Sequence, residues 1–600
     1  MPTLAAFDGV VGLAYCVAQM NVASTTQYAT PYEQGNQNQT TTWAACVAFY
    51  QTLATAFPGV LQFTQIGVSD GGWPLHAGVV TADGVFDRAV LREAQRPVFF
   101  NNNGIHPGEP EGIDVCMALV RDFCIDPARL AALGSTVFVF IPIYNVDGSN
   151  HRQNTSRVNQ VGPEQFGFRG NDRNLDLNRD FVKCDSLAAQ AFNQFFSAWD
   201  PAVMVDTHTS NGADYSYTMT LIATQSDKLG GALGEFWRTQ MQPAIYQTMA
   251  TLGWPTCPYV DLVGDIPDDG ILEFLDGGRY STGYAALHHT IGMMPETHML
   301  KPFADRYAAT RALLETVLAY TVANAAVIVG LRTKAKHAAA KRQTWPVTWT
   351  MDKARPSKFR FKGYTAVYSP SALGSYQRLG YDRSQPWEKD VLYYNRFNEA
   401  EMVAPPQAYL IGQAWCEVIT RLGWNNVTLH RLAQDQQFEV QCYRFGAVST
   451  RPTAYEGHLF HDQVSVTTTT ETVLARTGDY VVELNQANAR YIVETLEPLG
   501  DDSFFRWGFF DSVLERKEHY SAYVFEDLAV ELLRTEPGLQ EKFVQWKVAN
   551  PELVADQTSV LDFLFANAAA CAEPSYRRYP VFGLGSVAAA AALQNVAQRR

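Results

Sequence analysis

The chain has 600 residues, of which 47% are hydrophobic, 18% charged and 12% aromatic. These proportions exclude a mainly disordered, collagen-like or coiled-coil protein and predict a folded chain of several domains. The 61 acidic side chains outnumber the 47 basic ones and give a net charge of −14. A surface of that sign repels phosphate backbones and anionic lipid, so we expect no nucleic-acid partner.

Residues 9–23, GVVGLAYCVAQMNVA, form an apolar run that is typical either of a signal-peptide core or of an ordinary N-terminal segment. Asp8 lies where a signal peptide needs positive charge, so both interpretations stay open. The sequence contains no uninterrupted run of about 18 apolar residues and therefore predicts no integral membrane segment. The nine cysteines include no CxxC pair and indicate neither a disulfide scaffold nor a zinc–thiolate site. The sequence leaves compartment and oligomeric state open, with a secreted or periplasmic location slightly favoured over a cytoplasmic one.

Short apolar runs alternate with longer amphipathic stretches after an irregular lead-in over residues 1–42, which is typical of an α/β domain. Helices are expected over 43–57 and 113–123, and one long helix over 303–330. Strands are expected at 61–67, 75–80, 97–102, 137–143, 201–208 and 290–298. Polar residues follow several of these strands abruptly, and ligands of open α/β sheets bind where strands end.

A basic stretch at 332–343, RTKAKHAAAKRQ, is interpreted as a helix end or linker because the chain as a whole is acidic. Beyond it the texture changes to alternating segments such as KFRFKGYTAVY and FEVQCYRF, with helices expected over 406–422, 525–534 and 538–548. We therefore predict a domain over residues 43–343 and a β-rich α+β accessory region over 344–600. The accessory region could contain two small domains and shows no catalytic motif.

The loop after the strand at 97–102 contains His106 and Glu109, a spacing that lets an imidazole and a carboxylate converge on one metal ion. His208 ends another apolar strand. A histidine at a strand end is more often structural than a ligand when taken alone. Two histidines and one carboxylate, however, form the three-ligand set of catalytic zinc, which leaves a fourth position for water.

Two further segments carry charged side chains toward the same strand ends. FRGNDRNLDLNRDF at 168–181 is rich in Arg, Asn and Asp, and is interpreted as an anion clamp rather than as a solvated loop. Glu296 ends the strand at 290–296, where a carboxylate could cap the next helix or act as a general base.

These motifs together resemble the zinc metallocarboxypeptidases of the carboxypeptidase A/B type, in particular bacterial-type members with a long C-terminal accessory region. Any single motif is modest, but the ordered set within residues 43–330 is specific. The resemblance rests on His106-Pro107-Gly108-Glu109, Asn145-Val146-Asp147-Gly148, Arg169, Asp176-Leu177-Asn178-Arg179, His208 and Pro295-Glu296-Thr297-His298.

The resemblance implies a mixed, mostly parallel central sheet flanked by helices, followed by the β-rich region. It also implies one zinc ion held by His106, Glu109 and His208. Asp176 would orient the His106 ring, because metal-bound imidazoles generally need an acceptor on their other nitrogen.

By the same resemblance the chain would hydrolyse the C-terminal peptide bond of peptides, using a zinc-activated water with Glu296 as general base. Arg169 would polarise the scissile carbonyl and stabilise its oxyanion, an interaction that can supply roughly 3–4 kcal/mol. Asn178 and Arg179 would hold the terminal carboxylate, which restricts cleavage to the last residue of a peptide.

The sequence departs from the family in the segment Glu273–Tyr284, because no tyrosine sits at the distance from Glu296 where a lid tyrosine is expected. Tyr280 or Tyr284 could cap the substrate instead, and Tyr284 is taken as the candidate substrate contact. Asp276 would favour a basic terminal side chain and Arg279 an acidic one, and Arg279 could also join the carboxylate clamp. The preferred terminal residue stays open.

Two alternatives to a carboxypeptidase also stay open. The same zinc site could serve an amidohydrolase that acts on N-acyl amino acids or cell-wall peptides. A non-catalytic peptide-binding relative is the other, although such proteins usually lose the base or a metal ligand first.

Overall fold

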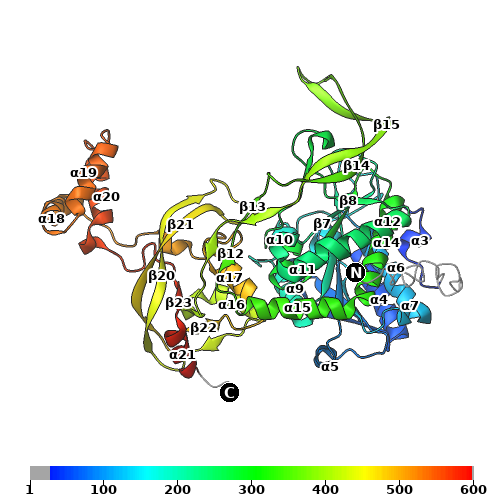
Figure 1. The fold of residues 1–600 in the computed structure, drawn as a ribbon, viewed down its shortest axis with the longest axis horizontal. Coiled ribbons are helices and arrows are strands. Elements are labelled where there is room, and N and C mark those ends of the chain that lie inside the picture. The colour runs from blue at the N-terminus through cyan, green and yellow to red at the C-terminus, as the bar shows by residue number, and fades with distance from the viewer. Residues whose placement is uncertain (1–26, 597–600) are drawn as a thin grey trace.

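The protein is described from a computed structural model that covers residues 27–596 (Figure 1). The apolar segment 9–23 lies outside the described residues. In the described part no single helix is long and apolar enough to cross a membrane; only the bent pair α14 (Phe303–Ala323) and α15 (Ala325–Ala339) reaches that length and composition when taken together.

A nine-stranded mixed sheet forms the N-terminal half of the molecule. Neighbours β3–β4, β3–β5, β5–β11, β6–β11 and β7–β8 are parallel, and β1–β2, β2–β4 and β7–β11 are antiparallel. The α/β fold with a mostly parallel sheet is therefore confirmed. Its strands in spatial order are β1 (Leu61–Val68), β2 (Pro74–Val80), β4 (Val137–Ile141), β3 (Val98–Asn102), β5 (Val203–Asp206), β11 (Ile291–His298), β7 (Met219–Ala223) and β8 (Thr256–Pro258), with β6 (His208–Ser210) beside β11.

Both faces of this sheet are covered, which explains why its central strands read as continuous apolar runs. Along β3, Phe99 points into one hydrophobic core, whereas Val98 and Phe100 point into another. The first core is closed by α4 (Trp43–Ala56), α6 (Glu111–Ile125), α12 (Gln242–Thr251) and α14 (Phe303–Ala323). The second is closed by α9 (Leu187–Trp199), α13 (Ser281–Leu287), α16 (Cys416–Trp424) and α17 (Ala489–Leu496).

Shorter helices connect these elements and lie at the loops around the sheet. They are α3 (Pro31–Gln34), α5 (Arg88–Glu93), α7 (Pro127–Ala131), α8 (Val146–Asn150), α10 (Ser226–Leu229), α11 (Gly231–Phe236), a π-helical turn at Trp237–Met241 and a 3₁₀ turn at Leu177–Arg179.

The long helix expected over 303–330 is in fact two helices, α14 and α15 (Ala325–Ala339), which meet at 78°. Asn324 between them leaves the helical conformation at φ −114° and ψ 18°. The bend brings the buried Arg332 of α15 onto the backbone oxygen of His289 at 2.8 Å and onto the Asp200 carboxylate at 2.8 Å. The expected single helix was therefore wrong, because its course is set by these distant acceptors.

The accessory region has its own six-stranded antiparallel sheet, which confirms that it is β-rich. The helix expected over 406–422 is wrong in its first part, because 408–411 is a buried strand and the helix α16 starts only at Cys416. The sheet runs β19 (His430–Arg431), β22 (Tyr480–Glu483), β18 (Ala408–Ile411), β23 (Val581–Leu584), β20 (Gln436–Thr450) and β21 (His461–Ala475), with α21 (Ser586–Gln594) against it.

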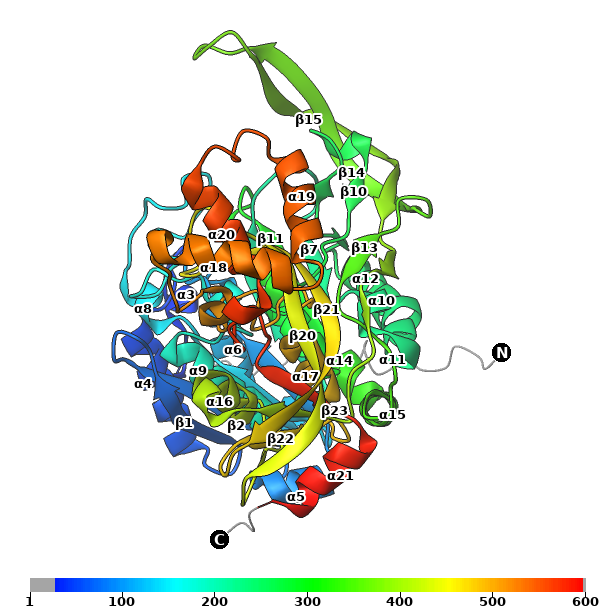
Figure 2. The same ribbon diagram turned by 90° about the vertical axis from the view of Figure 1, so that its left-hand side faces the viewer.

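Two smaller units project from the accessory region (Figures 1 and 2). The helices α18 (Ala522–Thr535), α19 (Leu539–Ala549) and α20 (Gln557–Asn567) surround a small core of their own at the end farthest from the nine-stranded sheet. The long hairpin of β14 (Ser357–Pro370) and β15 (Gln377–Tyr394) extends away from the body. At its base β15 pairs with β10 (Ile271–Leu272), which in turn pairs with β9 (Asp261–Leu262). Two-stranded sheets of β12 (Trp345–Pro346) with β17 (Met402–Val403) and β13 (Trp349–Met351) with β16 (Phe397–Glu399) link the halves.

The described part of the N-terminal lead-in packs on the large domain rather than standing apart from it. Tyr32 stacks on Tyr307 of α14, and the Thr40 hydroxyl and Thr41 amide both donate to the buried carboxyl of Asp114 on α6. Burial raises the pKa of Asp114 to about 7.

This shift predicts a pH-dependent stability. The carboxyl titrates near pH 4 in the unfolded chain, so folding favours its neutral form and the resulting stability is lost as pH rises from about 4 to 7. We expect Asp114→Asn to raise the melting temperature relative to the parent chain more at pH 8 than at pH 5. The exposed acid Glu93 on α5 supplies the control, because Glu93→Gln should show no such difference. An equal effect of Asp114→Asn at both pH values would contradict the assignment.

Candidate metal centre and substrate pocket

The candidate metal ligands lie where parallel strands of the main sheet end. His106 and Glu109 follow β3 in a loop that contains Gly104 at φ +66° and leads into α6. His208 opens β6, and the register of the parallel pair β6–β11 sets His208 beside Glu296. The topology thus brings together residues that are far apart in the sequence.

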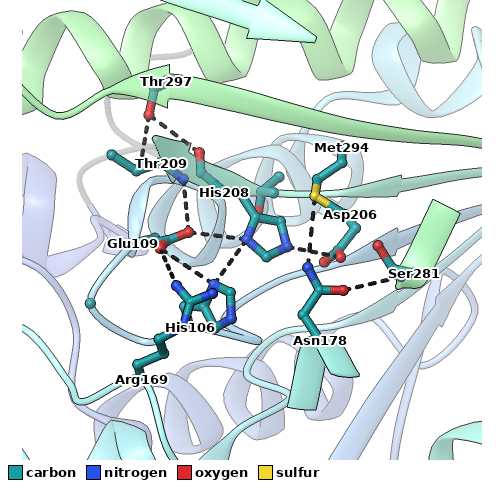
Figure 3. Close-up of polar contacts among 12 residues, drawn as sticks. His106, Glu109, Arg169, Asn178, Asp206, His208, Thr209, Ser281, Met294 and Thr297 are labelled. Atoms are coloured by element: carbon teal, nitrogen blue, oxygen red, sulfur yellow. Dashed lines mark hydrogen bonds and ion pairs between the residues drawn. The ribbon is translucent and has the colours of Figure 1, made fainter. Parts of the chain in front are cut away.

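One ligand atom from each of His106, Glu109 and His208 lies within 4.8 Å of the others, and all three residues are buried (Figure 3). The two Nδ1 atoms are 3.1 Å apart, and the Glu109 carboxylate lies 3.0 Å from the Nδ1 of His208 and 3.3 Å from that of His106. Two imidazoles and one carboxylate that converge in this way match the donor set of catalytic zinc.

The second ring nitrogen of each imidazole lies within hydrogen-bonding distance of a carboxylate. Nε2 of His106 lies 2.8 Å from Asp176, and Nε2 of His208 lies 2.9 Å from Asp206. A carboxylate partner on Nε2 fixes the proton there and leaves the Nδ1 lone pair for a cation. Asp206 was not among the candidates from the sequence, although its position two residues before His208 places it on the same side of an extended strand.

The charges around these ligands favour a bound cation. Burial alone would lower the pKa of His208, but the carboxylates of Asp206 and Glu109 raise it well above its usual range. For Glu109, burial is outweighed by Arg157 and the two imidazoles, which hold its pKa well below the ordinary value. Arg157 donates to Glu109 at 2.8 Å and to the Thr209 carbonyl at 3.0 Å, so it also fixes this ligand in place.

The cluster opens into a cavity of about 450 Å³ that is lined by Arg169, Asn178, Arg179 and Glu296, as well as by the three ligands. Arg169 is 45% exposed at its side chain and donates from Nε to Asp176 at 2.9 Å. Residues that sequence reasoning missed complete the wall, among them Ile222, Tyr259, Phe274, Met294 and the loop 156–159.

The Asn-Val-Asp-Gly motif at residues 145–148 contacts the loop that carries the pocket residue Arg169. Asn145 donates to the Arg169 carbonyl at 2.9 Å and accepts from the Gly148 amide at 2.9 Å. Asp147 accepts from the amides of Gly71 and Asp172. The motif therefore holds the loop that carries Arg169.

Asn178 and Arg179 lie side by side on the short turn Leu177–Arg179. Asn178 accepts from the Ser281 amide at 3.1 Å and its Nδ2 lies 3.8 Å from the sulfur of Met294. The guanidinium of Arg179 lies 4.5 Å from the ring centre of Tyr280, which also lines the cavity.

The structure corrects two candidate substrate contacts. Tyr284 is fully buried and donates to Asn425 of the accessory region at 2.6 Å, so it does not reach the pocket. Arg279 points away from the ligands and binds Asp502 at 2.7 Å. Asp276 is also buried outside the cavity, where its carboxylate accepts from the Gln225 amide.

The two other histidine pairs in the sequence lie away from the metal cluster. His458 binds Asp185 at 2.6 Å and His461 binds Asp511 at 2.8 Å, so the H-x-x-H pair shares no site. His288 and His289 are buried at the end of α13, away from the cluster.

The partners of the imidazoles predict a change in zinc affinity. Asp206→Asn keeps the size of the side chain but removes the charged acceptor of His208, and we expect zinc to bind about 10–100-fold more weakly. A competition titration against a chelator measures this. Asp172→Asn, which removes an exposed acid of the 168–181 loop, is the control and should bind zinc as the parent does. An unchanged affinity of Asp206→Asn would remove Asp206 from the site.

Comparison with known proteins gives a family match over part of the chain. Residues 46–219 match the model of a family described as zinc carboxypeptidase. No curated protein matches significantly. The matched segment includes His106, Glu109 and His208.

Several solved metallocarboxypeptidases overlap the chain at low similarity. They are a metallo-carboxypeptidase from Burkholderia cenocepacia (15% identity, 48% of this chain and 70% of that one, TM-score 0.36), carboxypeptidase A from Helicoverpa armigera (12%, 53% and 81%, 0.37) and a metallo-carboxypeptidase from Pseudomonas aeruginosa (13%, 47% and 69%, 0.35). The match is therefore to the zinc carboxypeptidase family, over the segment that carries the three candidate metal ligands.

Proposed function

We propose that the protein removes the C-terminal residue of peptides by zinc-dependent hydrolysis. The observation that carries this proposal is a single cavity that holds the three zinc donors, one further buried carboxylate and a group of cationic and amide side chains. The cavity would thus bring a metal ion, a base and an anion clamp to the same small ligand.

His106, Glu109 and His208 would hold the zinc ion. Zinc bound by such a set lowers the pKa of water to about 7 and polarises a carbonyl oxygen. The fit to this chain rests on the facing Nδ1 atoms and on the carboxylate behind each imidazole.

Glu296 would act as the general base. It lines the cavity, lies beside His208 in the strand register and is almost fully buried. Burial raises the pKa of Glu296 to about 8, against the lowering effect of His208 and Arg169. A carboxylate with a pKa near neutrality can both take a proton from water and return it to a leaving amine.

Arg169, Asn178 and Arg179 would bind the oxygen atoms of the substrate. Arg169 is partly exposed and is held by Asp176, which lies 2.9 Å from both its Nε and its Nη2. Its Nη1, which is 3.6 Å from Glu109, would be the nitrogen that stabilises an oxyanion. Asn178 and Arg179 offer an amide and a guanidinium for a terminal carboxylate. Only the last residue of a peptide carries such a group, so the clamp favours an exopeptidase.

The side chain of the terminal residue would enter the apolar wall beside this clamp. Met294 contacts Asn178 and Tyr280 lies under Arg179, and Ile222 and Phe274 continue the same wall. None of these four is charged, and neither Asp276 nor Arg279 lines the cavity. We therefore infer a preference for apolar or aromatic terminal residues.

Two substitutions separate the base from the metal site. Glu296→Gln should keep zinc and lower kcat by about 10²–10⁴-fold, because it removes proton transfer alone. His208→Ala should instead lose zinc, because only two of the three protein ligands would remain. Turnover with a saturating peptide and zinc content of the dialysed protein are the measurements. Normal turnover of Glu296→Gln, or full zinc loading of His208→Ala, would refute the corresponding role.

A set of peptides that differ only at the C-terminal residue tests the substrate. We expect kcat/KM for Phe and Leu termini to exceed that for Lys and Asp by about tenfold or more, because a charged group would lose water without gaining a partner. Mass spectrometry should show shortening by one residue. The same peptide with a C-terminal amide is the control and should resist cleavage. Release of acyl groups without shortening would indicate an amidohydrolase instead.

A further inference from the structure

The segment that carries the substrate clamp is bound on its outer side by the accessory region. Residues 173–185 contain Asp176, Asn178 and Arg179, and they run between the pocket and a turn at Tyr455–His458. This turn lies about 280 residues further along the chain, in the region that carries no catalytic motif.

The turn has a specific and costly geometry. Tyr455 and His458 exchange two backbone hydrogen bonds, at 2.8 and 3.1 Å, so only Glu456 and Gly457 lie between them. Both have left-handed backbones, with φ of +50° and +86°. A glutamate rarely adopts that conformation, and such residues persist where the surrounding structure holds them.

The strained position aims the Glu456 carboxylate at the clamp segment. Its Oε2 accepts the backbone amide of Asp176 at 2.8 Å. Asp176 in turn uses its two carboxylate oxygens on His106, Arg169 and the Asn178 amide. The residue that orients a metal ligand and begins the clamp is therefore itself held by a charge from the accessory region.

The far end of the segment is held in the same way. His458 binds Asp185 at 2.6 Å, and Arg421 of α16 donates to the Lys183 carbonyl at 2.6 Å and to Asp185 at 3.1 Å. Three accessory side chains thus contact this segment at two places, before and after the clamp.

The opposite wall of the pocket has a matching attachment. Arg279, next to the pocket residue Tyr280, binds Asp502 at 2.7 Å, and its guanidinium lies 5.6 Å from the ring centre of Tyr455 and 5.0 Å from that of Trp507. The Ser281 amide on this wall donates to Asn178. Both sides of the clamp therefore depend on contacts from residues beyond 450.

We propose that Glu456 is a positioning residue for the substrate clamp, and that the turn Tyr455–His458 makes the accessory region part of the active site. The proposal rests on the carboxypeptidase function proposed above. Without the Glu456 carboxylate the Asp176 amide loses its acceptor, and the turn that presents Asn178 and Arg179 is free to move. The terminal carboxylate of the substrate is then bound more weakly, whereas the metal donors keep their own partners.

Steady-state kinetics of Glu456→Ala and Glu456→Gln tests the role. A hydrogen bond to a charged acceptor is worth about tenfold in an equilibrium, so we expect Glu456→Ala to raise KM by about 10-fold with a smaller change in kcat and full zinc content. Glu456→Gln retains a side-chain oxygen and should restore most of the parent KM. Glu541→Ala removes an exposed acid from α19 and is the control. A general loss of folding would lower the active fraction and kcat together at unchanged KM, and that result, or equal impairment of the Ala and Gln variants, would overturn the proposal.

Amide hydrogen exchange supplies a readout that needs no turnover. We expect a peptide spanning residues 173–180 to exchange about tenfold faster or more in zinc-loaded Glu456→Ala than in the parent, with the exchange of the main sheet unchanged. Absence of peptide shortening by the parent chain would count against the proposed function alone. Unchanged exchange of this segment would count against the positioning role of Glu456, whatever the substrate proves to be.

Discussion

Charge balance in one buried cluster is the constraint on which the site depends. Three carboxylates and two imidazoles meet at the strand ends, from Glu109, Asp176, Asp206, His106 and His208. Four of these five residues are buried. Uncompensated charges in such a place cost several kcal/mol each. The guanidiniums of Arg157 and Arg169 and hydrogen bonds to the remaining oxygens offset part of this cost, and a bound cation would offset more of it. The same charges set the chemistry, because a site that must attract a divalent cation also orients the groups that surround it.

The topology of the sheet explains why so much of this site could be predicted from the sequence. Parallel strands all end at the same edge, so an abrupt change from apolar to polar residues marks the site wherever it occurs. His106 and Glu109 after β3 and Glu296 in β11 follow that pattern, and each depends on local sequence alone. The strands β3, β4 and β11 could also be predicted, because strands that are buried on both faces appear in the sequence as short continuous apolar runs.

What could not be predicted depends on partners that are distant in the sequence. Tyr284 has the residue type of a lid contact, but Asn425 accepts its hydroxyl inside the core. Arg279 has the charge of a substrate clamp, but Asp502 and a set of aromatic rings hold it elsewhere. The break at Asn324 is set in the same way by the acceptors of Arg332. When a side chain has two chemically suitable partners, the fold decides which of them it binds, and its neighbours in sequence do not.

The division of the chain at residue 343 illustrates the same principle at the scale of domains. The composition of the sequence changes there, and the two large sheets are separate. One hydrophobic core nevertheless contains residues of both halves. Phe192 and Met204 belong to the N-terminal half, and Ile411 and Tyr491 belong to the accessory region. Residues that share a core are stabilised together, because removing either half exposes the apolar surface of the other. The contacts of Glu456, His458 and Asp502 extend this shared core to the rim of the pocket. A region without a catalytic motif can therefore determine how well the catalytic residues of another region are held, and the composition of the sequence alone contains no sign of it.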